Sequence, residues 1–142
     1  MRHALLAMLA MTAMLSTAPA MAETVHFTAS LDGASETPPN TSAGKGAADL
    51  TLNTDSKTLT WTVTYSDLSG PATMAHLHGP AAVGAAAGVQ VPLTPPLDSP
   101  MKGAAALTDG QIGDLRGGLW YVNIHTSQHP GGEIRGQILQ VK

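Results

Sequence analysis

A period-two alternation of apolar and polar residues is the feature that most restricts how this chain can fold. It is clearest over residues 58–65, where leucine, tryptophan, valine and tyrosine alternate with threonines. Because successive side chains of a strand point to opposite faces, this segment has one apolar face and one threonine face. Such a strand fits an antiparallel sheet with one face on a core and the other in solvent.

Similar alternation recurs in short segments separated by turns rich in glycine, proline and asparagine. We expect further strands over residues 24–30, 48–52, 74–78, 89–93, 120–126 and 134–141. Short strands of this kind predict an all-β fold, an antiparallel β-sandwich with or without Greek-key connections. The apolar faces predict a core that contains Trp61, Val63, Leu77, Trp120, Val122 and Ile124.

Residues 107–118 are the one good candidate for a helix. Thr108 is suited to the N-cap, and Gln111 follows three residues later, as in a capping box. Two internal glycines shorten the segment, and Gly117 and Gly118 end it. The chain is therefore expected to contain at most one short helix.

The first 22 residues have the pattern of an export signal. A short basic start at Arg2 and His3 is followed by an apolar run over residues 4–15 and by small residues that fit cleavage after Ala22. The run is shorter than the roughly 20 apolar residues that a membrane span requires. We expect a signal peptide over residues 1–22 and one domain over residues 23–142. The mature chain is then periplasmic or secreted and has no membrane span.

Composition excludes several classes of site. The chain has seven Lys and Arg residues against ten Asp and Glu, without a basic run, which argues against a nucleic-acid partner. It has no cysteine, so neither disulfides nor a cysteine-type zinc site can stabilise the fold.

Four of the six histidines lie in two short segments, and they form the main functional signal. His76 and His78 share one face of their predicted strand, about 6.5–7 Å apart. His125 lies on the polar face of its strand, and a short loop can fold His129 back over the same point. Neutral imidazoles without thiolate favour Cu(II) or zinc. We therefore predict a metal site made by His76, His78 and His125, with His129 as the fourth ligand.

Several neighbouring residues have two interpretations each. Met74 shares the face of His76 and is either a soft axial donor to copper or a packing residue. Glu36 either orients a histidine or simply belongs to a turn. His26 is either a further ligand or a solvated residue, and we expect the latter. Glu133 and Arg135 are expected to form a surface ion pair of little energetic weight.

Two further side chains lie on the polar face of the strand that carries His125. Tyr121 and Asn123 alternate with the apolar residues of that strand, so they share its histidine face. Both can hydrogen-bond to a bound ligand.

Four segments together resemble one known family. The segments 29–39, 75–80, 121–126 and 129–138, which include Ala-His-Leu-His-Gly-Pro and His-Pro-Gly-Gly-Glu-Ile-Arg-Gly-Gln-Ile, are similar to the CHRD domain. This domain is repeated in the animal protein chordin and occurs singly in exported bacterial proteins. The resemblance implies an immunoglobulin-like β-sandwich outside the cytoplasm over residues 23–142. In animals the host protein binds secreted growth factors, which implies a possible exported protein partner.

A weaker, local resemblance is to copper/zinc superoxide dismutase, which also presents two copper ligands from a His-x-His strand. It makes a superoxide-dismutase-like sandwich the alternative fold. This chain lacks a cysteine pair and an obvious run of bridging and zinc-ligand residues. A dual-metal enzyme of that kind is therefore not expected.

Three functions follow from the sequence. The first is an exported protein that binds a transition metal, copper before zinc, for sequestration, delivery or tolerance. The second is a protein- or matrix-interaction module in which the histidines are structural. The third is a mononuclear copper enzyme with redox activity. Metal stoichiometry separates the second function from the others, and turnover separates the third from the first.

Overall fold

The computed structural model describes residues 18–19 and 21–142. The predicted signal peptide falls largely on residues outside this part of the chain. The structure contains strands and one short helix: β1 (Thr24–Asp32), β2 (Lys45–Asn53), β3 (Thr58–Ser66), β4 (Ala72–His78), β5 (Val89–Pro92), β6 (Met101–Ala106), α1 (Asp109–Arg116), β7 (Tyr121–Thr126), β8 (Ile134–Gln137) and β9 (Leu139–Gln140).

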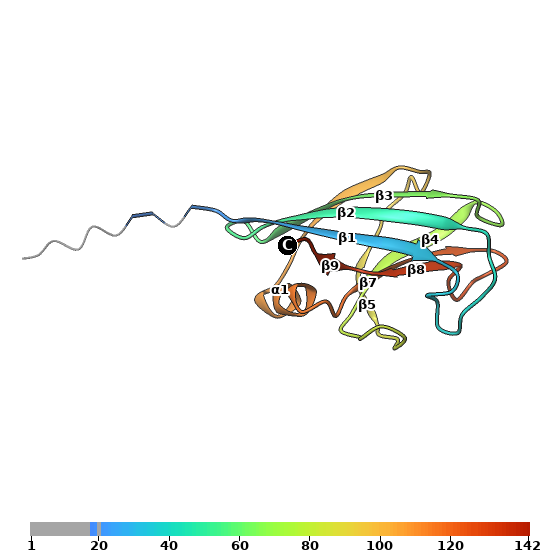
Figure 1. Ribbon diagram of the computed structural model, residues 1–142. Helices are drawn as coiled ribbons and strands as arrows, with labels where there is room; N and C mark the ends of the chain where they lie inside the picture. Colours follow the sequence, from blue (N-terminus) through green and yellow to red (C-terminus); the bar gives the residue numbers. More distant parts are fainter. Residues whose placement is uncertain (1–17, 20) are drawn as a thin grey trace, which may run out of the picture.

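The strands form one continuous antiparallel sheet in the order β5-β4-β7-β8-β1-β2-β3-β6, and β9 is a third partner of β1, after β2 and β8. Figure 1 shows β1, β2 and β3 running side by side, with β4, β7 and β8 folded back beneath them. The sheet is therefore barrel-like and nearly closed. The all-β antiparallel prediction with one short helix is confirmed. An immunoglobulin-like, Greek-key or superoxide-dismutase-like sandwich is not confirmed, because the strands follow a single hydrogen-bonded path.

The core lies inside this curved sheet and consists of the apolar faces that alternation predicts. All six predicted core residues are buried, from fully enclosed Trp120 to Trp61, which is 7 % exposed. On β3 the threonines lie on the other face, where Thr60 and Thr64 are exposed. The period-two pattern is thus reproduced as an inner and an outer face of the sheet.

Strand β6 was not predicted from the sequence. Its composition, Met-Lys-Gly-Ala-Ala-Ala, has few of the β-branched and aromatic residues that mark strands. It pairs with β3, and Gly103 lies opposite Trp61. A Cβ at Gly103 would lie 2.5 Å from Cζ2 of the indole. The glycine therefore leaves room for a large side chain that the neighbouring strand places against it.

Helix α1 begins where the sequence predicts. Thr108 is its N-cap and forms a capping box with Gln111. The helix buries Leu115 and ends at Gly117. Among the described residues, no helix has the length and apolar character needed to cross a membrane.

Candidate metal centre

Strands β4 and β7 are neighbours, and their register places the histidines together. Met74 lies opposite His125, and His76 lies opposite Asn123. Residues that face each other across a ladder project to the same side of the sheet. The alternate residues of both strands, including Leu77 and Ile124, point into the core. The imidazoles therefore lie on the outward side of the sheet, and backbone pairing alone brings them into proximity.

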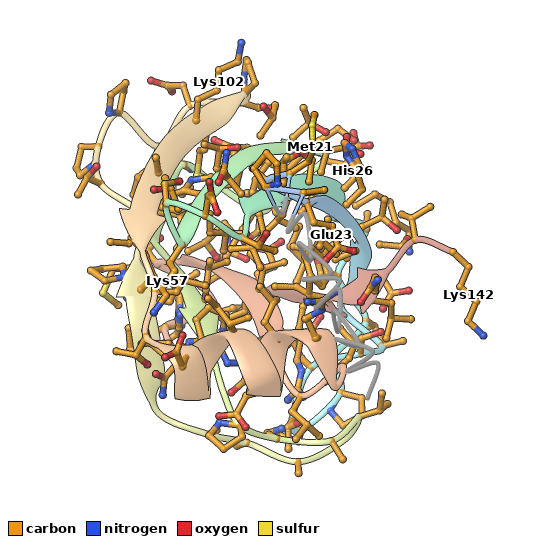
Figure 2. The ribbon with its side chains drawn as sticks, turned by 90° about the vertical axis from the view of Figure 1, so that its left-hand side faces the viewer. Met21, Glu23, His26, Lys57, Lys102 and Lys142 are labelled. Carbon is orange, nitrogen blue, oxygen red and sulfur yellow. The ribbon has the colours of Figure 1, made fainter. Side chains whose placement is uncertain are left out.

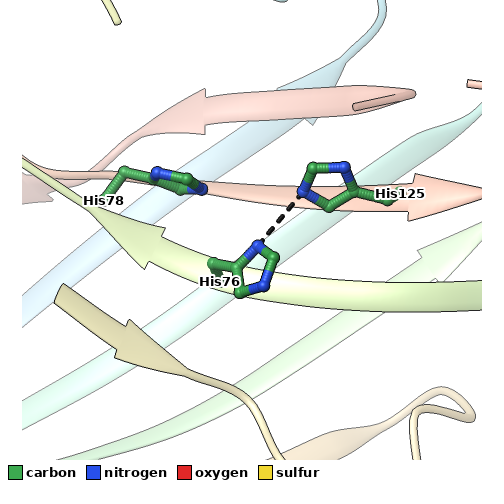
Figure 3. A group of neighbouring side chains, drawn as sticks. All are labelled: His76, His78 and His125. Atoms are coloured by element: carbon green, nitrogen blue, oxygen red, sulfur yellow. Dashed lines mark hydrogen bonds between the residues drawn. The ribbon is translucent and has the colours of Figure 1, made fainter. Parts of the chain in front are cut away.

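Three of the four predicted histidines meet at one point. One ring nitrogen from each of His76, His78 and His125 lies within 4.8 Å of the other two. Figure 3 shows His76 on β4 facing His125 on β7, with a distance of 3.1 Å between Nδ1 of the first and Nε2 of the second. Two nitrogens on a tetrahedral ion at 2.0–2.1 Å are about 3.3–3.4 Å apart. The observed spacings are close enough for one ion to bind all three rings after small rotations.

Backbone carbonyls fix the orientation of two of these rings. Nδ1 of His78 lies 2.9 Å from the carbonyl oxygen of Ala87, and Nδ1 of His125 lies 2.8 Å from that of Pro130. A carbonyl oxygen only accepts, so each Nδ1 carries a hydrogen and donates it. In the neutral rings Nε2 is then left with a free lone pair. This tautomer leaves Nε2 available to bind a metal, and the contact is of the kind that commonly orients such ligands.

Asn123 lies between the two oriented rings. Its Oδ1 is 3.0 Å from Nε2 of His78 and 3.1 Å from Nε2 of His125. The side chain is only 4 % exposed. An amide oxygen thus belongs to the same cluster as the three ring nitrogens.

The outward face of β7 is covered as well as its core face. Every residue of the strand is buried, including the polar Asn123 and His125. Tyr121 lies parallel to the His78 ring at a centroid distance of 4.8 Å, and its hydroxyl hydrogen-bonds to the backbone of Ala87. On its other side, the guanidinium of Arg135 lies 3.6 Å from the tyrosine ring centre. His78 therefore stacks on an aromatic ring that is itself in contact with a cation.

Burial favours the neutral form of the histidines. Desolvation lowers the pKa of His76, and the neighbouring His125 and His78 lower it further. Desolvation also lowers the pKa of His125, against the opposing effect of the carbonyl of Pro130. Neutral imidazole is the form that can bind a metal, so these lowered pKa values favour the form in which the three histidines could hold an ion.

The structure does not bring the other sequence candidates into this cluster. His129 lies outside the three-histidine group and lines a neighbouring cleft together with Glu36. Its role as a fourth ligand stays a prediction. Met74 is 46 % exposed on the histidine side of β4. His26 is exposed on β1, as expected, and Figure 2 shows it near Met21 and Glu23 on the outside of the molecule.

Glu36 is not an exposed turn residue, and its neighbour in the site is Asn123. The side chain is 6 % exposed, and its Oε1 has no hydrogen-bond partner. Burial raises the pKa of Glu36 to about 7, although the backbone of Thr37, the charge of Arg135 and the Asn123 amide all act to lower it. Its backbone N–H also donates to the carbonyl of Gly33, 3.2 Å away, so Glu36 belongs to a turn, and its role in orienting a histidine stays a prediction.

The predicted surface ion pair between Glu133 and Arg135 is wrong, because both residues are buried. Glu133 is fully enclosed and accepts hydrogen bonds from Ser42 Oγ at 2.6 Å, Ser69 N at 2.8 Å, Ser69 Oγ at 2.7 Å and Thr126 Oγ1 at 2.5 Å. Burial alone raises the pKa of this carboxyl, but the hydrogen bonds outweigh it and lower the pKa to about 2. The covering loops come from distant parts of the chain, so local alternation could not reveal the burial.

Two contributors to the site could not be predicted from the sequence. They are the carbonyls of Ala87 and Pro130, which orient the rings of His78 and His125. A backbone carbonyl has no residue type of its own, and its position depends on how the loops close. Asn123 could be placed from the sequence, because it alternates with the core residues of β7 and therefore shares the face of His125.

Comparison of the chain with curated proteins and with solved structures gives no match. A comparison with family models gives one, described as the CHRD domain, over residues 27–138. The match includes both histidine segments and extends from β1 through β8, which is nearly the whole described part of the chain. The chain therefore belongs to the CHRD domain family.

Proposed function

We propose that this CHRD-domain protein binds one transition-metal ion through His76, His78 and His125 and serves in metal sequestration, delivery or tolerance. The observation that carries the proposal is the orientation of the rings. Carbonyl contacts hold the Nδ1 hydrogens of His78 and His125 away from the cluster, and their Nε2 lone pairs face inward beside His76. A purely structural histidine needs no such convergence of acceptors.

Copper is the first choice of metal and zinc the second. Imidazole binds both ions, and for a given set of nitrogen and oxygen ligands Cu²⁺ binds more tightly than Zn²⁺. The cluster has no thiolate, because the chain has no cysteine. Four-coordinate geometry and three histidines are also common to zinc sites, so zinc is the alternative ion.

The signal-like leader supports export. We propose that residues 1–22 are removed after Ala22 and that the mature protein is periplasmic or secreted. There it would meet metal ions outside the cytoplasm.

The decisive experiment is metal analysis of the mature protein, prepared from the periplasm without a histidine tag. We expect one equivalent of bound metal after titration with Cu²⁺ or Zn²⁺. His76→Ala combined with His78→Ala should abolish binding and leave the β-sheet circular dichroism unchanged. His26→Ala is the matched control, because His26 is exposed on β1 and lies outside the three-histidine group. It should bind as the wild type does.

A wild-type protein that binds no ion would refute the metal function. The three rings would then be structural, linked through the contact between His76 and His125 and those to Asn123. The interaction-module hypothesis, which the relation to the growth-factor-binding host of this family suggests, would replace it. If metal binds, an assay for redox turnover separates a binding protein from a copper enzyme.

A further inference from the structure

The three histidines and Asn123 bring together more hydrogen-bond acceptors than there are donor hydrogens to pair with them. In the neutral rings, Nε2 of His78 and Nε2 of His125 both carry lone pairs, since their hydrogens lie on Nδ1. Both point at Asn123 Oδ1 from 3.0 and 3.1 Å, and an amide oxygen is also an acceptor. Nδ1 of His76, 3.1 Å from Nε2 of His125, can donate one hydrogen to that atom. The contact between Nε2 of His78 and Oδ1 of Asn123 still brings two acceptors together without a hydrogen between them. In a buried place this arrangement is unfavourable unless a cation lies among them.

The surroundings of Asn123 decide which end of its amide faces the histidines. Nδ2 lies on the side of Gly132, where a Cβ would be 2.9 Å from it and 2.5 Å from Oε1 of Glu36. The Glu36 carboxylate is buried, and this oxygen has no hydrogen-bond partner. In its ionised form the carboxylate only accepts, so a reversed amide would then place oxygen against oxygen. Glu36 therefore favours the orientation in which Nδ2 faces the carboxylate and Oδ1 faces the imidazoles.

Gly132 makes this close approach feasible. Its φ is +127°, in the region that favours glycine, and it packs directly against both Glu36 and Asn123. Any side chain there would displace the carboxylate or the amide. The loop after β7 thus holds Glu36 and Asn123 in contact from one side.

From this arrangement we propose that Asn123 Oδ1, in place of His129, is the fourth ligand of the metal and that Glu36 is a positioning residue that holds its amide in place. The proposal rests on the metal-binding function above and adds the class of ion. Amide oxygen is a hard donor, whereas the monovalent Cu⁺ prefers softer ligands. The fourth ligand therefore selects divalent ions, Cu²⁺ or Zn²⁺, over Cu⁺.

Affinities of the variants for Zn²⁺ and Cu⁺ test this assignment, each measured by competition with a chelator. Loss of an outer partner of a metal ligand costs about 10–100-fold in affinity. We expect Glu36→Gln to weaken Zn²⁺ binding by about this factor, and Asn123→Ala by at least as much. Both should leave Cu⁺ affinity unchanged. Asn123→Asp restores an oxygen donor and should recover Zn²⁺ binding.

The matched control is Asn40→Ala. This substitution also removes a side-chain amide. That amide donates to the backbone carbonyl of Glu133 and not to an imidazole. A second readout is the visible spectrum of the Co²⁺-loaded protein. It should change in Asn123→Ala, where water replaces the amide oxygen, and remain that of the wild type in Asn40→Ala.

The outcomes separate this inference from the function on which it rests. If the wild type binds Zn²⁺ and Asn123→Ala binds it equally well, with the same Co²⁺ spectrum, the fourth ligand is wrong and the three-histidine site stands. If the wild type binds no ion, both proposals fail. Should Asn123→Ala not fold, Glu36→Gln decides, and unchanged Zn²⁺ affinity in that variant overturns the proposal.

Discussion

Glu133 joins three separate parts of the chain at the scale of a single residue. Its carboxylate accepts hydrogen bonds from Ser42 before β2, from Ser69 before β4 and from Thr126 at the end of β7. The donors match an enclosed carboxylate, so these hydrogen bonds favour its ionised form. Burial of this carboxylate would cost free energy in any conformation in which one of these segments did not supply its hydrogen bond.

Glu133→Gln should lower the free energy of unfolding at pH 7 by about 3 kcal/mol. The folded-state pKa is about 2 and the ordinary value is 4.5, so this contribution is present above pH 4.5 and is lost as pH falls towards 2. Urea unfolding at pH 7 and at pH 3 checks both the size and the sign. Glu23→Gln, which loses only an exposed contact with Arg116, is the control and should change stability by less than about 1 kcal/mol. Equal effects of the two substitutions would contradict the argument.

Metal release should follow the protonation of the histidines. Protons compete with the ion for neutral imidazole, and burial lowers the pKa of His76 and His125 below the ordinary value. Occupancy should therefore be full above about pH 6.5 and fall as the pH drops further below this value. Metal content after dialysis at pH 7.5, 6.0 and 4.5 measures it. Unchanged occupancy at pH 4.5 would speak against histidine ligation.

At the scale of elements, alternation of apolar and polar residues predicts a strand well when the strand's own side chains show which face is buried. Strands β3, β4 and β7 were found from their own residues, and so was the shared face of His76 and His78. Strand β6 could not be found in this way, because its own residues show no such pattern. Its place in the sheet depends on its partner β3, whose Trp61 packs against Gly103. The burial of Glu133 and Arg135 was missed for a related reason, since contacts from distant loops create it.

The capping box of α1 gives a prediction for this element. Thr108→Ala should destabilise the protein by about 1 kcal/mol, because the backbone N–H of Gln111 loses its acceptor. Thermal or urea unfolding measures the change. Thr94→Ala is a suitable control, since Thr94 is exposed in a loop. A comparable loss from Thr94→Ala would show that the cap is not the cause.

At the scale of the whole molecule, one apolar core has to stabilise a chain without disulfides. The sequence predicted the membership of this core but not the closure of the sheet. Alternation tells which face of a strand is buried and does not tell which strand comes next to it. The two halves of the sheet are joined where β8 and β9 both reach β1, through Arg135 opposite Asp32 and Gln140 opposite Phe27. These pairings are long-range and leave no local signal.

Trp120→Ala should therefore affect the entire fold. The indole is fully enclosed, and large-to-small changes of this kind cost about 3–5 kcal/mol. We expect a single cooperative unfolding transition at a lower denaturant concentration than in the wild type. Tryptophan fluorescence from Trp61 still reports the transition in the variant. A loss below 1 kcal/mol would mean that the site relaxes to fill the cavity.

The three histidines differ in how firmly they are held, and this difference bears on how quickly an ion could leave. His78 and His125 are each fixed by a backbone carbonyl. His76 is half-buried and packs edge-on against the other two rings, and its one ring hydrogen-bond contact in the described part of the chain is with His125. The His76 ring is therefore the one that can swing aside. An incoming ligand from a chelator or an acceptor protein could take its place before the other bonds break. Stepwise displacement of this kind lets a tightly held ion be handed over without ever being free in solution.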